Sequence, residues 1–301
     1  MNTINDIPDF NNWDTIQVIN KGWSSDKKYY IKTIEGKELL VRTTDISQYE
    51  KKKREYEELK LLATMDILMP LPVDFGICND RKFVYILLTW INGEDAESIL
   101  PNLSVEEQYR LGIKAGELLK KIHSISAPQD IPNWEERFNR KINVKMANYH
   151  GCDIRFPDDD RFISYIEDNR HLLENRPQTL QHGDYHVGNM IITPEIELGI
   201  IDFNRMDYGD PWEEFNRITF CVENSPIFAS GYINGYFSHQ VPDTFFRLLA
   251  LYIATNQLSS IPWAIPFGEE EVNTMLRITK NVSDWYDGFS TYIPNWYIDR
   301  I

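Results

Sequence analysis

The sequence predicts an α+β fold of two lobes, a small β-rich lobe over residues 1–91 and a larger, mainly helical lobe over residues 92–301. Its 301 residues exceed the length of one average domain. The first ninety residues contain short segments rich in aromatic and β-branched side chains, separated by turn residues and one helical stretch. Beyond them, apolar residues recur at helical spacing.

Three strands are expected near the start of the chain, over residues 13–21, 28–34 and 37–44. Gly22 begins the turn between the first two, and Glu35 and Gly36 turn the chain into the third. A glycine-containing turn of the first kind can fold over a phosphate, with Ser24 and Ser25 as hydrogen-bond donors. The same residues also suit a plain hairpin turn.

A helix is expected over residues 47–65. Its basic run, residues 51–54, lies among several glutamates, so we expect a solvated helix face there. Pro70 and Pro72 interrupt the chain before a strand that starts at Val73. Residues 83–90 then form a dense apolar strand, which loosens into a linker at residues 91–94.

The second lobe begins with a clear helix signal. Ser104 and Glu107 have the spacing of a capping box, and the apolar face behind them predicts a helix to about His123. An acidic turn at residues 157–160 precedes another helix. After Phe215 we expect several helices with breaks at four prolines, namely Pro226, Pro242, Pro262 and Pro266.

The segment from Gln181 to Phe215 carries the chemistry. Asp184, Asn189 and Asp202 follow one another along the chain, and the residues between the last two predict strand, turn and strand. Such a hairpin would return Asp202 toward Asn189. An acid that orients a hydroxyl, followed by an amide and a second acid that hold Mg²⁺, is the arrangement that phosphoryl transfer needs.

This segment resembles the aminoglycoside phosphotransferase family, whose members are relatives of eukaryotic-type protein kinases. The resemblance rests on H-G-D-x-x-x-x-N at residues 182–189, I-D-F at 201–203 and G-D-P-W-E-E-F at 209–215. Protein kinases have H-R-D and D-F-G instead, so Gly183 and Asn204 favour a small-molecule kinase. The resemblance implies a protein-kinase-like fold, Asp184 as catalytic base and Mg²⁺ on Asn189 and Asp202.

The same resemblance implies where the phosphoryl donor, ATP or GTP, would bind. Arg42 stands where the kinase pattern has a phosphate-binding Lys, and Glu55 is its expected carboxylate partner, with Glu58 as the weaker choice. Backbone groups of the hinge, Thr89, Trp90 and Ile91, would bind the base. His182 and Asp210 are expected to support the catalytic loop.

An acceptor pocket of the family type would use acidic side chains against ammonium groups. The candidates are Glu213, Glu214, Glu223, Asp284 and Asp287, with Trp285 and Trp296 as aromatic surfaces, and Glu214 also suits a structural role. An aminoglycoside is the expected acceptor. The alternatives are a metabolite such as fructosamine, choline or homoserine, and a kinase-like protein with weak or no catalysis.

The amino-acid composition indicates which classes of binding partner to expect. A formal net charge of −15 disfavours nucleic acid and suits a small cationic acceptor, although solubility alone explains an acidic chain equally well. Cys78, Cys152 and Cys221 are far apart and odd in number, which predicts no disulfide framework. The first residues lack the pattern of a signal peptide, and no apolar run reaches the length of a membrane span, so we expect a cytoplasmic protein.

Overall fold

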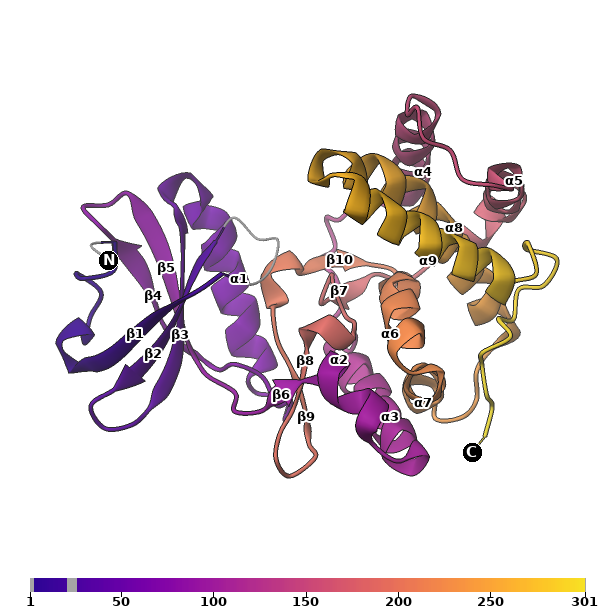
Figure 1. The fold of residues 1–301 in the computed structure, drawn as a ribbon. Helices are drawn as coiled ribbons and strands as arrows, with labels where there is room; N and C mark the ends of the chain where they lie inside the picture. Colours follow the sequence, from indigo (N-terminus) through magenta and orange to yellow (C-terminus); the bar gives the residue numbers. More distant parts are fainter. Residues whose placement is uncertain (1–2, 21–25, 301) are drawn as a thin grey trace. The chain divides into compact units, whose positions relative to one another are not determined.

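The computed structural model describes residues 3–20 and 26–300, which divide into two compact units. The sheet unit comprises Met1–Glu94 and Met190–Asn204, and the helical unit comprises Asp95–Asn189 and Arg205–Ile301. Figure 1 shows strands with one long helix in the former and mostly helices in the latter. Ser24 and Ser25, predicted to contact phosphate, lie outside the described residues.

The sheet unit is built on an antiparallel sheet. Within the described residues it has five strands in the order β1-β2-β3-β5-β4. Their bounds are β1 (Trp13–Ile19), β2 (Lys27–Thr33), β3 (Glu38–Asp45), β4 (Pro72–Cys78) and β5 (Phe83–Thr89), with short 3₁₀ turns η1 (Phe10–Asn12) and η2 (Ile46–Gln48). The predicted strands are therefore present, with ends shifted by a few residues.

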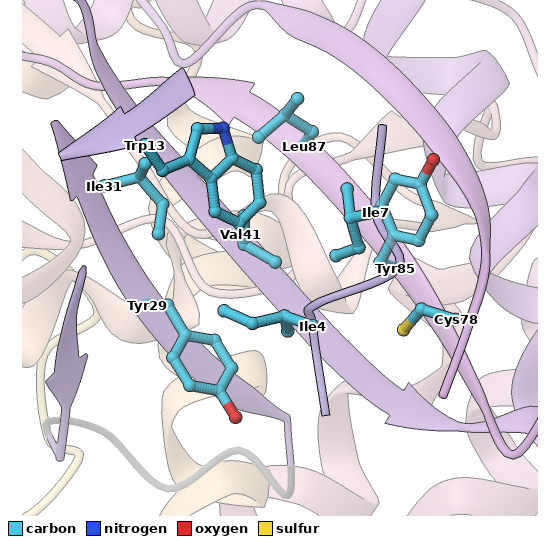
Figure 2. Close-up of a cluster of buried hydrophobic side chains, with 9 residues drawn as sticks. All are labelled: Ile4, Ile7, Trp13, Tyr29, Ile31, Val41, Cys78, Tyr85 and Leu87. Atoms are coloured by element: carbon cyan, nitrogen blue, oxygen red, sulfur yellow. The ribbon is translucent and has the colours of Figure 1, made fainter. Parts of the chain in front are cut away.

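One face of this sheet carries an apolar core, drawn in Figure 2. Side chains point alternately to the two faces of a strand. Tyr29 and Ile31 of β2, Val41 of β3 and Leu87 of β5 therefore gather on one face. The N-terminal segment covers this face through Ile4 and Ile7, both almost completely buried.

The opposite face carries charged residues. The register pairs Lys28 of β2 with Arg42 of β3, and Arg42 with Ile86 of β5. Helix α1 (Tyr49–Leu62) contacts β4 and β5 and buries Lys52, Glu55, Leu59 and Leu62. The expected solvated face was wrong for Lys52, which is only 6% exposed because it belongs to the buried stripe of this helix.

A hairpin from later in the chain completes the sheet unit. Strands β8 (Met190–Ile192) and β9 (Leu198–Ile200) pair antiparallel, with Met190 opposite Ile200. The N–H of Ile200 also donates to the carbonyl of Leu68, 2.8 Å away. Strand β6 (Glu94–Asp95) marks the point where the chain passes from the sheet unit into the helical unit.

The helical unit contains the remaining elements. Its helices are α2 (Ala96–Ile99), α3 (Val105–Ile122), α4 (Trp134–His150), α5 (Asp159–Asn169), α6 (Ile218–Asn224), α7 (Pro226–Phe237), α8 (Asp243–Ala264) and α9 (Glu269–Trp285). The 3₁₀ turns are η3 (Leu100–Asn102), η4 (Arg170–Leu173), η5 (Val187–Asn189), η6 (Phe203–Arg205), η7 (Glu213–Arg217) and η8 (Ile265–Phe267), where η6 spans the junction between the units.

Helix α3 begins at the predicted capping box, since Ser104 and Glu107 exchange side-chain and backbone hydrogen bonds. It packs closely against α7. A Cβ at Gly112 would lie 2.2 Å from the carbonyl oxygen of Phe228, so this approach requires glycine. The expected break at Pro262 was wrong: this proline lies inside α8, two residues before the helix ends at Ala264, so the single hydrogen bond that its missing N–H removes lies in the final turn.

A two-stranded ribbon frames the candidate site. Strand β7 (Thr179–Gln181) pairs antiparallel with β10 (Asp207–Gly209), with Gln181 opposite Asp207. The residues that follow β7 are therefore brought alongside those that precede β10. Among the described residues, the three cysteines are free, and no helix is both long and apolar enough to cross a membrane.

Candidate active site

Asp184 lies in the loop between β7 and η5, largely shielded from solvent. Its carboxylate is surrounded by three basic groups. His186 Nε2 lies 3.5 Å and Arg217 Nε 3.4 Å from Oδ1, while Arg205 Nη1 lies 3.4 Å from Oδ2. Burial opposes the charged form, but the hydrogen bond from His186 and the charges of Arg217 and Arg205 outweigh it and hold the pKa of Asp184 well below its usual range.

Gly183 gives the loop its shape. Its φ of +85° lies in the left-handed region, and a Cβ there would lie 2.0 Å from the carbonyl oxygen of Arg205. An arginine, as in H-R-D, could not occupy this position without moving the backbone. The glycine that distinguished the motif from a protein kinase is therefore a steric requirement of this loop.

The carboxylate of Glu214 accepts hydrogen bonds from the backbone of the Asp184 loop. The N–H of Gly183 donates to both of its carboxylate oxygens, at 3.0 and 3.1 Å, and Nε2 of His123 lies 3.8 Å away. The glutamate is only 2% exposed. Of the two roles open to Glu214 from the sequence, these contacts support the structural one.

Internal hydrogen bonds set the rest of the loop. Nδ1 of His182 accepts the N–H of Asp184 at 3.3 Å, and the hydroxyl of Tyr185 donates to the carbonyl of Ala115 in α3 at 2.7 Å. Asn189 donates its amide N–H to the carbonyl of Asp184 at 2.8 Å. This bond fixes the amide of Asn189 so that its other end, the oxygen, is the group available to a cation.

Asp210 is a fully buried anchor beside the loop. Its carboxylate accepts two hydrogen bonds from Arg176, at 2.7 and 3.0 Å, and one from the hydroxyl of Tyr252. Its backbone carbonyl accepts from Gln181, the residue that precedes the loop. Asp210 thus reaches the loop through β7, while the bond to the loop's own backbone comes from Glu214.

The other acidic residues predicted to bind an acceptor all have partners inside the chain. Lys141 contacts Glu213 at 2.9 Å; burial opposes the charged form, but this lysine outweighs it and lowers the pKa of Glu213. Glu223 pairs with Arg277, Asp284 with Lys280, and Asp287 accepts from the Ser290 hydroxyl. Asp284 and Asp287 are exposed, whereas Glu223 and Glu213 are mostly covered.

In the sheet unit, Arg42 belongs to a ring of four charged side chains. Its Nη1 donates to Glu55 and its Nη2 to Asp26, each at 2.6 Å. Lys52 closes the ring with bonds to Asp26 at 2.6 Å and Glu55 at 2.9 Å. All four side chains are less than 10% exposed. The structure thus brings together Arg42 and Glu55 and adds two partners that the sequence analysis missed.

Asp202 follows strand β9 and has a φ of +65°, a strained value for an aspartate. Its side chain is 24% exposed, and its Oδ2 accepts from Nζ of Lys28 at 3.2 Å. The ammonium of Lys28 therefore contacts one oxygen of the Asp202 carboxylate. This contact indicates that the carboxylate of Asp202 can bind a cation.

The hinge backbone is partly engaged. The N–H of Thr89 donates to Leu71 at 2.9 Å, and the N–H of Trp90 donates to Glu38 at 3.0 Å. Of the predicted hinge residues, Ile91 has no backbone hydrogen bond of this kind within the described part of the chain. The side chain of Trp90, 36% exposed, packs edge-on against Tyr30.

The donor groups fit Mg²⁺. Residues 3–20 and 26–300 hold no cluster of three or more His, Cys, Asp or Glu side chains with metal-binding geometry. Magnesium needs no such cluster, because it keeps several waters and takes one or two carboxylates together with substrate phosphates. Taken one at a time, the amide oxygen of Asn189 in the helical unit and the carboxylate of Asp202 in the sheet unit are each a group that Mg²⁺ accepts as a ligand.

Residues that sequence reasoning missed include Asp26, Lys28, Lys52, Arg205 and Arg217. The burial of Lys52 could have been predicted from the sequence. Lys52, Glu55, Leu59 and Leu62 have the spacing of one helix face, so two charged residues share a stripe with two leucines. The other four residues act across distances in the sequence that no local pattern records.

Comparison with known proteins gives the family. Residues 15–248 match the model described as "Phosphotransferase enzyme family". A curated relative, mouse (Mus musculus) acyl-CoA dehydrogenase family member 10, is 22% identical over an alignment of 205 residues that covers 63% of this chain. The chain spans only 19% of that protein's length.

Solved structures share the fold at low sequence identity. The gentamicin complex of APH(2″)-IIa is 18% identical, with 88% of this chain and 91% of that chain covered and a TM-score of 0.63. The GDP complex of wild-type aminoglycoside 2′-phosphotransferase-IIIa is 15% identical, with 93% and 95% covered and a TM-score of 0.66. Amicoumacin kinase hAmiN with AMP-PNP and Ca²⁺ is 14% identical, with 94% of this chain and 91% of that chain covered and a TM-score of 0.64.

These likenesses confirm the predicted kinase-like α+β fold. The family match covers more than half of the chain and includes the loop of Asp184, the β8–β9 hairpin and the charged face of the sheet. The chain therefore belongs to the phosphotransferase enzyme family.

Proposed function

We propose that this protein transfers the γ-phosphoryl group of ATP or GTP to a hydroxyl of a small molecule, with Asp184 as the catalytic base. One observation carries the proposal. The carboxylate of Asp184 lies in a loop fixed by internal hydrogen bonds, is partly buried, and is kept ionised by three basic neighbours. Such a group is preorganised to accept a hydrogen bond from an incoming hydroxyl.

The low pKa of Asp184 defines how it would act. A carboxylate of this kind is a weak base, so its main contribution is to orient the acceptor hydroxyl and to take its proton late in the reaction. This suits phosphoryl transfer, because the loose transition state demands little deprotonation of the nucleophile. Arg205 and Arg217, next to Asp184, are placed to offset negative charge on the transferred group.

Asn189 and Asp202 would hold the metal ion. Asn189 offers a neutral oxygen oriented by its bond to the Asp184 carbonyl, and Asp202 offers a carboxylate that already accepts a cation. When bound, Mg²⁺ would neutralise charge on the phosphate oxygens. The nucleotide itself is supported by the relatives, whose structures contain GDP or AMP-PNP. Among the described residues, the N–H of Ile91 has no backbone acceptor, which supports a hydrogen bond from this group to the base.

The named relatives support an aminoglycoside or another cationic antibiotic as the acceptor, since one was solved with gentamicin. A second candidate is a metabolite kinase. The observation that favours it is that every acidic residue predicted for acceptor binding already has an internal partner, which is a Lys or Arg for Glu213, Glu223 and Asp284 and a hydrogen-bond donor for Glu214 and Asp287.

The test is a coupled nucleotide-turnover screen over aminoglycosides, macrolides, amines, sugars and hydroxy acids, with ATP and with GTP. On the best acceptor, Asp184→Asn should lower kcat by about 10²- to 10⁴-fold and leave Mg²⁺–nucleotide affinity nearly unchanged. Asp130→Asn, an exposed acid of the same unit, is the matched control and should retain full turnover. Equal turnover in Asp184→Asn would remove that residue from the base role.

A further inference from the structure

Two cations lie side by side on one face of the sheet unit, Lys28 on β2 and Arg42 on β3. The register places them directly opposite each other in neighbouring strands, so their side chains leave the sheet on the same face. A phosphate that approached one would therefore pass close to the other. Lys28 and Arg42 differ in the carboxylates that they contact and in how exposed their side chains are.

Arg42 is closed off. Both terminal nitrogens of its guanidinium are bound to carboxylates, and the arginine is only 4% exposed. Of its three remaining N–H groups, the one on Nε is buried without a hydrogen-bond partner among the described residues. A phosphate could reach Nε only after the ring with Glu55, Asp26 and Lys52 had opened. That opening would leave buried carboxylates without their cations, at a high free-energy cost.

Lys28 is open by comparison. Its ammonium is 3.2 Å from Oδ2 of Asp202, its one ion-pair partner in the described part of the chain, and its side chain is 14% exposed. An ammonium has three donors, and a single carboxylate oxygen at this distance leaves capacity for other acceptors. The four-carbon stem of lysine also lets the charge move by a few ångströms without any change in the backbone.

We propose that Lys28, and not Arg42, is the side chain that binds the phosphates of the nucleotide in this protein. The inference rests on the proposed function, because it assumes a nucleotide on this face. Without nucleotide, Lys28 neutralises Asp202. With Mg²⁺–nucleotide bound, the carboxylate of Asp202 would hold the metal ion, and the ammonium of Lys28 would then be available to the phosphate oxygens. The ring around Arg42 then has a structural role, which is to fix α1 to the sheet.

The charges agree with this division. Arg42 and Lys52 balance Asp26 and Glu55, so the ring is neutral and offers no net attraction to a phosphate. Lys28 balances Asp202 in the same way until a divalent ion takes that carboxylate. From that point Lys28 is an uncompensated positive charge beside the nucleotide.

The test measures nucleotide affinity by titration calorimetry, using ATP or GTP with Mg²⁺, whichever wild type binds more tightly. Lys28→Met keeps the apolar stem and removes the charge, and should weaken the affinity by about 10- to 100-fold. Lys28→Arg should recover most of it. Lys27→Met is the matched control, because Lys27 is the exposed neighbour on the same strand, and its affinity should equal that of wild type.

A second titration with the corresponding nucleoside, which has no phosphates, separates phosphate binding from damage to the unit. Lys28→Met should bind the nucleoside like wild type. If Lys28→Met keeps wild-type affinity for the nucleotide, or loses nucleoside affinity in equal proportion, the assignment of Lys28 is wrong while the proposed function stands. If wild type itself binds neither ATP nor GTP with Mg²⁺, the proposed function fails, and the assignment fails with it.

Discussion

Replacing Arg42 by Met should destabilise the sheet unit strongly. The change removes one of the two cations in the ring and leaves Asp26 and Glu55 to share Lys52. All of these side chains are less than 10% exposed, so water cannot replace the lost partner. Removing one partner from a buried ion pair costs about 3–5 kcal/mol. That range corresponds to roughly a hundredfold to a few thousandfold in the unfolding equilibrium.

The matched control lies on the same helix. Lys60 pairs with Glu57 at 3.1 Å, but both side chains are more than half exposed. An exposed pair of this kind contributes about 0–1 kcal/mol, so Lys60→Met should be nearly neutral. Urea unfolding followed by tryptophan fluorescence gives both values, since Trp13 and Trp90 belong to the sheet unit.

The pH dependence gives a second check on the same variant. In wild type, burial disfavours the charged form of Asp26, but Arg42 and Lys52 outweigh it and lower the pKa of Asp26. The ring therefore contributes stability above the ordinary carboxyl range, and this stability is lost as pH falls through the lowered pKa. The difference between wild type and Arg42→Met should accordingly shrink in acid. A cost within 1 kcal/mol of that for Lys60→Met at neutral pH would refute the reasoning.

Three further predictions concern the loop and the metal site. Gly183→Ala should destabilise the protein by about 2 kcal/mol or more and abolish turnover, because its Cβ would meet a backbone carbonyl at 2.0 Å; Gly36→Ala, with a similar φ of +83° but no atom within 4 Å, should cost only about 1 kcal/mol in a thermal melt. In a pH profile of kcat/KM, wild type should show no loss from Asp184 down to the ordinary carboxyl range, whereas Arg217→Gln should move the acid limb to higher pH. Asp202→Asn should weaken Mg²⁺-dependent nucleotide binding in calorimetry by about tenfold or more and leave nucleoside binding intact.

Local patterns were enough to predict the fold class and the β8–β9 hairpin that separates Asn189 from Asp202. Strand alternation, the capping box at Ser104 and the proline and glycine turns act over a few residues, so they can be read from the sequence. The roles of buried charges could not be read in this way. Glu214 is 31 residues from Gly183 in the chain, and Lys28 is 174 residues from Asp202.

The basic run taken by itself also does not show which of its lysines are buried. Lys52 resembles its neighbours Lys51 and Lys53 in the sequence, yet those two are exposed and Lys52 is not. The difference comes from the helix face, since Lys52 lies three residues before Glu55 and seven before Leu59. Burying a charged lysine is costly unless paired carboxylates offset its desolvation, and Asp26 and Glu55 do so for Lys52.

The discontinuous make-up of the sheet unit has a consequence for biosynthesis. Its first segment ends at Glu94, but the hairpin that completes it begins at Met190. At the usual rate of translation, roughly 5–20 residues per second, the ribosome needs about 5 to 20 seconds to make the intervening stretch. During that time the nascent sheet lacks β8, β9 and Asp202. A fragment that ends at Glu94 would lack them altogether.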